Sequence, residues 1–172
     1  AGLTGLAKGT RVVAGGGDNA CGAVGSGVVV EGRVLATIGT SGVVFAHSDK
    51  MKVEEHMRLH SFCHSVPACW CATGVVLMAG GALRWYKDVF CQHETDYART
   101  AGLDIYDLIT QGAAKIQPGS EGLFFLPYLA GERTPHQSAE ARGAFIGAAI
   151  RHSKDHFARA VLEGITYAMR DS

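Results

Sequence analysis

Short apolar runs, bounded by glycine, proline or charged residues, fill much of the chain up to position 76. Runs of this length are typical of buried strands. The segment 19–25 differs, because it consists of small residues and is suited to a helix packed closely on its neighbour. Between two of the runs lies "GTSG" at 39–42, which is short enough for a tight hairpin. We therefore predict strands at 11–14, 33–38, 43–46, 61–65 and 70–76.

Helical spacing of apolar residues appears in the second half of the chain. The segment 77–93 has apolar positions three and four apart, which predicts a helix. A second helix is predicted at 104–116, with Asp104 as its candidate N-cap. A last helix is predicted to open near Ser153. The remaining apolar runs, at 123–128 and 144–146, are predicted strands. Strands lead and helices follow, so the fold class is α/β.

Size and composition describe an ordinary globular chain. Its 172 residues can bury one core, and its formal net charge of zero gives no electrostatic case for binding nucleic acid or an anionic membrane. No apolar run reaches bilayer-spanning length, and the first residues lack the pattern of a signal peptide. We therefore expect a cytoplasmic protein. The five cysteines, an odd number, favour reduced thiols over a disulfide framework.

The stretch "VVAGGGDNACGAVG" places an acid, Asp18, directly after three glycines. An acid where a strand turns into a helix lies where α/β folds bind their ligands. A carboxylate there can accept a proton from an attacking hydroxyl, and Asn19 offers a polyol both a donor and an acceptor. The plainer interpretation is that Asp18 only caps the helix.

The hairpin "TIGTSG" adds a second candidate feature. Glycines flanking Thr40 and Ser41 can present backbone N–H groups and hydroxyls to phosphate oxygens. The same letters also suit a plain turn, and they do not form a Walker A loop, because no lysine follows at the required spacing. A base followed by a phosphate-binding hairpin is the combination that phosphoryl transfer to a hydroxyl requires.

Several stretches together resemble the second half of the FGGY carbohydrate kinases, and within them the xylulokinase branch most. They are "VVAGGGDNACGAVGSG", "IGTSGVVF", "HSFCHSVPACW", "GGALRWYKD" and "FLPYLAGERTPH", in this order, covering nearly the whole chain. The stretch "GAFIGAAIRHSKDHFARAVLEG" resembles the family's C-terminal signature, with Ala148 in place of a larger aliphatic residue. The resemblance implies the ribonuclease-H-like (actin-like ATPase) fold, here as an incomplete lobe comprising residues 1–172.

The resemblance also implies roles for individual residues. Asp18 would be the catalytic base that takes the proton from the sugar hydroxyl, and Asn19 would lie against the sugar. Gly39 and Thr40 would lie against the ATP phosphates, with Ser41 shaping the turn. ATP would be the phosphoryl donor, and Mg²⁺ would arrive with the nucleotide.

The resemblance implies a partner lobe as well. These kinases have two lobes with the site between them, and their N-terminal lobe supplies most sugar contacts. We therefore expect the chain alone to be inactive, and the complete enzyme to convert D-xylulose and ATP to D-xylulose 5-phosphate. Two alternatives stay open: a sister kinase for gluconate, ribulose or another polyol, and a non-catalytic nucleotide-binding module of the same fold.

Two further groups of polar residues suit either a functional role or a plain structural one. His56, His60 and His64 recur every four residues near Cys63, Cys69 and Cys71. Pro67 and the C-x-C spacing argue against a zinc site, so we favour buried thiols and strand histidines and assign no metal ligand. The loop "GERTPH" suits either a cleft wall or a surface pair of Glu132 and Arg133.

Overall fold

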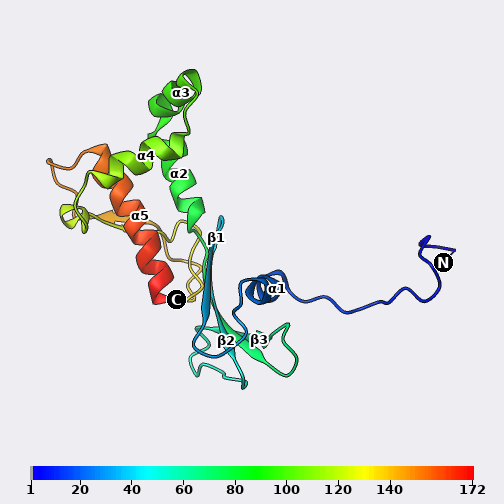
Figure 1. The fold of residues 1–172 in the computed structure, drawn as a ribbon. Helices are drawn as coiled ribbons and strands as arrows, with labels where there is room; N and C mark the ends of the chain where they lie inside the picture. The colour runs from blue at the N-terminus through cyan, green and yellow to red at the C-terminus, as the bar shows by residue number, and fades with distance from the viewer. Residues whose placement is uncertain (1) are drawn as a thin grey trace.

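A four-stranded antiparallel sheet lies at the centre of the fold (Figure 1). The computed structural model describes residues 2–172. The strands lie in the order β1-β2-β4-β3, and the register pairs Ile38 with Gly42 and Phe45 with Thr73. Their bounds are β1 Val34–Ile38, β2 Gly42–Ser48, β3 His60–Cys63 and β4 Trp70–Val76. Strands β1 and β2, and β3 and β4, pair as neighbours in sequence, whereas β2 pairs with β4 across the intervening β3.

The two faces of this sheet carry different layers, because successive side chains of a strand point to opposite sides. Helix α1 (Asp18–Gly25) packs on one face, and Phe45 is buried there with the small residues of the helix. Helix α5 (Lys154–Asp171) approaches the other face with its C-terminal end. A Cβ at Gly42 would collide with the Met169 side chain, so a larger residue there would displace this methionine from the sheet.

The larger core belongs to the helical half of the molecule, which Figure 1 shows beyond the sheet. Tyr86, Leu123 and Val161 are fully buried in it, and the Tyr86 hydroxyl donates to the Lys154 carbonyl at 2.9 Å. Its elements are α2 Gly80–Phe90, α3 Gln92–Ala101, α4 Ile105–Ala114, the short 3₁₀ helix η1 Ser120–Gly122, β5 Phe124–Leu126, β6 Ala144–Ile146 and α5. Strands β5 and β6 form a separate antiparallel pair.

Several predictions from local pattern are confirmed. The chain forms a hairpin around 39–42 and a helix after the triple glycine. Asp104 is the N-cap of α4, where its Oδ1 accepts the Tyr106 N–H at 2.8 Å. Ser153 is the N-cap of α5, and its side chain and that of His156 satisfy the first backbone donors reciprocally.

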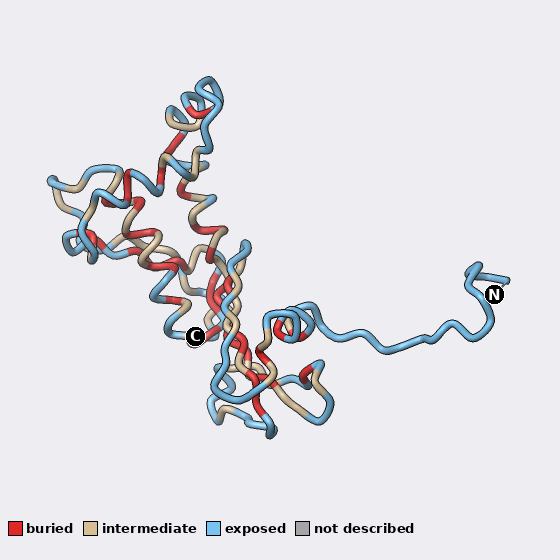
Figure 2. Tube along the Cα trace, viewed as in Figure 1, coloured by how far each residue is buried: buried red, intermediate tan, exposed pale blue. Residues whose placement is uncertain are grey.

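The predicted strand at 11–14 is wrong. These residues have no regular structure, and Val12 and Val13 are 92% and 82% exposed. Figure 2 shows this segment as an exposed stretch that leads away from α1. A short apolar run becomes a strand only where another strand offers it hydrogen bonds, and within residues 2–172 none pairs with it.

The helix predicted at 77–93 is also corrected. The chain from Leu77 to Ala79 is held by side-chain and hairpin groups, so α2 begins only at Gly80. The helix ends at Phe90, because Cys91 leaves helical geometry, and α3 follows as a separate helix that the pattern did not predict.

Within residues 2–172, no helix combines the length and the apolar composition that crossing a membrane requires.

Candidate active site

Asp18 lies at the start of α1 with its side chain exposed. The N-cap position is occupied by Gly17, which makes no side-chain capping bond, so Asp18 is not the helix cap of the plainer interpretation. Its Oδ1 accepts the backbone N–H of Asn19 at 2.8 Å. A carboxylate in the first helical turn is also favoured by the partial positive charge of the helix N-terminus. The Asp18 carboxylate thus remains accessible to a ligand.

Asp18 and Asn19 line one cavity of about 410 Å³. Helix α1 forms one side of it, and the sheet face that α1 covers forms the other. Burial raises the pKa of the Cys71 thiol in this cavity, so the sulfur stays protonated at neutral pH. The residues lining the cavity from the sheet are Phe45, Phe62, Cys63, Cys71 and Thr73.

These sheet residues were not predicted as part of a site. They come from three strands and meet only through the register that pairs Phe45 with Thr73 and Phe62 with Cys71. A single sequence carries no signal for that pairing beyond the alternation of faces along each strand. Only Asp18 and Asn19, which are adjacent in the chain, could be found locally.

The hairpin 39–42 is seated on the N-terminus of α2. The Gly39 carbonyl accepts the Gly80 N–H at 2.9 Å, and the Thr40 carbonyl accepts the N–H groups of Ala79 and Gly81 at 2.9 and 3.0 Å. A Cβ at Gly80 would collide with the Gly39 carbonyl. The two glycines of α2 therefore allow a close helix–hairpin contact, which explains their place in a helix despite their cost.

The two polar side chains of the hairpin differ in exposure. Thr40 is exposed, and Ser41 is half-buried. Gly39, Thr40 and Ser41 do not line the cavity of Asp18. They are joined to it by β2, along which Phe45 lies roughly 10 Å beyond Gly42 at about 3.3 Å per residue. The structure thus brings Asp18 and Asn19 together and places the hairpin at the near end of the strand beneath them.

The "GERTPH" loop is a structural support and also lines a second cavity. Glu132 is buried, and its Oε1 accepts the N–H groups of Leu77 and Arg133 at 2.9 and 2.7 Å. Thr134 accepts the Val75 N–H at 3.1 Å through Oγ1 and donates to the Arg58 carbonyl at 2.9 Å. Glu132 and Arg133 also line a largely apolar cavity of about 730 Å³.

Comparison with known proteins places the chain among carbohydrate kinases. The model of the FGGY family of carbohydrate kinases, C-terminal domain, matches residues 34–172. A xylulose kinase of Staphylococcus epidermidis is 47% identical over 168 residues, which are 98% of this chain and 32% of that kinase. A gluconokinase of Bacillus subtilis is 39% identical over 159 residues, which are 92% of this chain and 31% of that kinase. The crystal structure of xylulose kinase from Rhodospirillum rubrum superimposes with a TM-score of 0.84 at 31% identity, covering 98% of this chain and 32% of that one.

The architecture is therefore that of an α/β lobe of the ribonuclease-H-like (actin-like ATPase) class, as the resemblance implied. The family match covers most of the residues, including the whole sheet and every helix after it. The chain belongs to the FGGY family of carbohydrate kinases. It spans about a third of the length of the curated relatives it matches.

Proposed function

We propose that the chain is part of the second lobe of an ATP-dependent kinase that converts D-xylulose to D-xylulose 5-phosphate in the cytoplasm. The observation that carries this proposal is the exposed Asp18 carboxylate beside Asn19 on the wall of a cavity. The preference for D-xylulose over gluconate follows the higher identity to the xylulose kinase. The remaining two thirds of such a kinase would supply the other lobe, so the chain alone would be inactive.

In this proposal Asp18 is the catalytic base. It accepts the proton of the terminal sugar hydroxyl as the hydroxyl oxygen forms a bond to the γ-phosphorus of ATP. The bond from that phosphorus to the bridging oxygen breaks, and ADP leaves with the electron pair. Asn19, half-buried next to Asp18, orients the sugar through its amide donor and acceptor.

The hairpin fits the phosphate end of ATP. Its carbonyls are engaged by residues at the start of α2, which fixes the backbone, while the Thr40 side chain is exposed. Gly39, Thr40 and Ser41 are therefore assigned to the ATP phosphates. Mg²⁺ neutralises phosphate charge when it arrives with the nucleotide. We assign it no residue of this chain, because Asp18 is needed as the base.

A panel of acceptors tests the proposal. Full-length protein is incubated with ATP and D-xylulose, D-ribulose, gluconate or glycerol, and ADP formation is followed. We expect the highest kcat/KM for D-xylulose. A preference for gluconate or ribulose would replace the substrate but keep the reaction. ATP binding without transfer to any acceptor would instead support the non-catalytic module and contradict the kinase.

A further inference from the structure

Three metal-ligating side chains meet where β2 and β4 leave the sheet. The last pairs of the ladder join Ser48 to Trp70 and His47 to Cys71. Asp49 directly follows β2, and Cys69 directly precedes β4. The side chains of His47, Asp49 and Cys69 come together at this end of the sheet.

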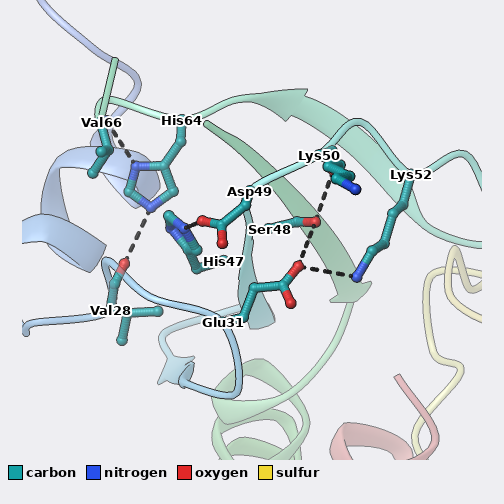
Figure 3. Close-up of polar contacts among 9 residues, drawn as sticks. All are labelled: Val28, Glu31, His47, Ser48, Asp49, Lys50, Lys52, His64 and Val66. Carbon is teal, nitrogen blue, oxygen red and sulfur yellow. Dashed lines mark hydrogen bonds and ion pairs between the residues drawn. The ribbon is translucent and has the colours of Figure 1, made fainter. Parts of the chain in front are cut away.

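The ligand atoms of these three side chains are close together. One ring nitrogen of His47, one carboxylate oxygen of Asp49 and the sulfur of Cys69 lie within 4.8 Å of one another. Figure 3 shows the Asp49 carboxylate against the His47 ring, where Oδ1 lies 2.9 Å from Nε2. The His47 side chain is fully buried, whereas that of Asp49 is 65% exposed. The group is therefore open to solvent on the carboxylate side.

Cys69 is held in place by its backbone. Its carbonyl accepts the His64 N–H at 2.9 Å, and its own N–H donates to the Val66 carbonyl at 3.2 Å. These bonds close the turn between β3 and β4. The thiol therefore needs only side-chain rotation to approach the pair formed by His47 and Asp49.

Both ring nitrogens of the neighbouring His64, and the thiol of the neighbouring Cys71, are already engaged by backbone groups. Nδ1 of His64 accepts the Val66 N–H at 3.0 Å, so its Nε2 carries the hydrogen and donates to the Val28 carbonyl at 3.2 Å. The Cys71 thiol donates to the Phe62 carbonyl at 3.5 Å. By contrast, the buried Nδ1 of His47 has no hydrogen-bond partner among residues 2–172. The His47 ring is held at one nitrogen only, so its hydrogen can change position.

We propose that His47, Asp49 and Cys69 bind one divalent cation of the Zn²⁺ type, with water as the fourth ligand. Imidazole, thiolate and carboxylate are the ligands that zinc takes in proteins. With metal–ligand bonds of about 2.0–2.3 Å, ligand atoms of a tetrahedral ion lie roughly 3.3–3.7 Å apart. The exposed Asp49 side chain and the Cys69 thiol reach these separations by small rotations, while the buried His47 ring stays in place.

Each hydrogen that the cation displaces from its ligands has a place to go. The cation takes the place of the hydrogen between Nε2 and Asp49, and that hydrogen is held on Nδ1, so the ring stays neutral. The thiol hydrogen of Cys69 passes to solvent, and the sulfur binds as thiolate. The ion would then join the ends of β2 and β4 beyond their last backbone pair.

Nearby charges do not compete for the cation. Glu31 accepts from Lys52 Nζ at 3.2 Å and from the Ser48 hydroxyl at 3.5 Å, as Figure 3 shows. Lys52 thus neutralises the Glu31 carboxylate. The proposed site has a single carboxylate and a single thiolate, which together match the charge of a divalent ion.

Cobalt(II) titration of the full-length protein under reducing conditions tests the site. Co²⁺ replaces Zn²⁺ in such sites and reports a thiolate ligand by a charge-transfer band in the near ultraviolet. We expect that band to reach its maximum at one ion per chain, together with intense visible bands, and to disappear when Zn²⁺ is added. Cys69→Ser should abolish the charge-transfer band, and Asp49→Asn should weaken Co²⁺ binding at least tenfold.

The matched control is Cys21→Ser, which removes an exposed thiol outside the group. It should leave the band unchanged. The difference spectrum between wild type and Cys69→Ser isolates this site from any other in the protein. A protein whose circular dichroism shows it folded but which gives no charge-transfer band would overturn the proposal. So would a band that survives Cys69→Ser. Kinase activity plays no part in this test, so its outcome is independent of the proposed function.

Discussion

The sheet with α1 and the helical half built from α2 to α5 bury apolar cores of very different size. The helical half has a large apolar core with Tyr86, Leu123 and Val161 fully enclosed. The sheet half has a smaller cluster around Phe45, and it carries the exposed Asp18 and the hairpin. We infer that the helical half supplies most of the stability and that the sheet half carries the chemistry. Substitutions in the two halves should therefore separate folding from activity.

The largest effect on stability is expected in the helical core. Leu123 is 1% exposed, and Leu123→Ala removes its packing and leaves a cavity. We expect the free energy of unfolding to fall by about 2–5 kcal/mol, measured by urea denaturation. Leu103, which is 48% exposed, provides the matched control, and Leu103→Ala should change stability by less than about 0.5 kcal/mol. Equal losses in the two variants would contradict the assignment of this core.

A substitution at the junction between the two halves should change both the stability and the activity. Gly80→Ala places a methyl group against the Gly39 carbonyl and pushes the hairpin away from α2. We expect a loss of about 1–3 kcal/mol in stability and a higher KM for ATP. Gly22→Ala, at a helical glycine with open space around it, should not raise this KM. An unchanged KM for ATP in Gly80→Ala would separate the hairpin from the nucleotide.

A smaller effect is expected at the cap of α4. Asp104→Ala removes the acceptor of the Tyr106 N–H and should cost about 1 kcal/mol, read from thermal or urea unfolding. Asp104→Asn should restore most of the loss, because asparagine caps equally well. Failure of this rescue would mean that the carboxylate acts through its charge and not as a cap.

The smallest effect is a pH dependence at the surface. Hydrogen bonds from the Arg58 side chain and backbone lower the pKa of Glu54 from 4.5 to about 2. Because the folded-state pKa is depressed, the pair stabilises the fold above about pH 4.5 and loses this contribution as the pH falls towards 2. Stability curves of wild type and Glu54→Gln should therefore converge between these pH values. Curves that stay parallel down to pH 2 would refute the pair's contribution.

Features that depend on adjacent residues could be predicted from the sequence, whereas features that depend on the pairing of distant strands could not. The hairpin at 39–42, the cap at Asp104 and the position of Asp18 at the start of a helix depend on neighbouring residues, so they could be predicted. The apolar run at 11–14 could not be judged without knowing its pairing partner. The walls of the Asp18 cavity depend on strand register, which a single sequence does not fix.

The proposed cation site also could not be predicted from the spacing of histidines and cysteines, because it depends on strand register. His56, His60 and His64 recur every four residues, whereas His47 lies outside this regular spacing. The register of β2 against β4 instead brings His47 and Asp49 close to Cys69. Residues separated by about twenty positions meet only because two antiparallel strands end together.

The most direct test of the account is the turnover of Asp18→Ala in the full-length kinase at saturating ATP and D-xylulose. Asp96→Asn, which alters an exposed aspartate in the helical half, serves as the control. The account predicts that kcat falls about 10²–10⁴-fold in Asp18→Ala, while the Kd for ATP and the unfolding midpoint stay near wild type. A kcat within a few-fold of wild type would contradict the role of Asp18 as the base.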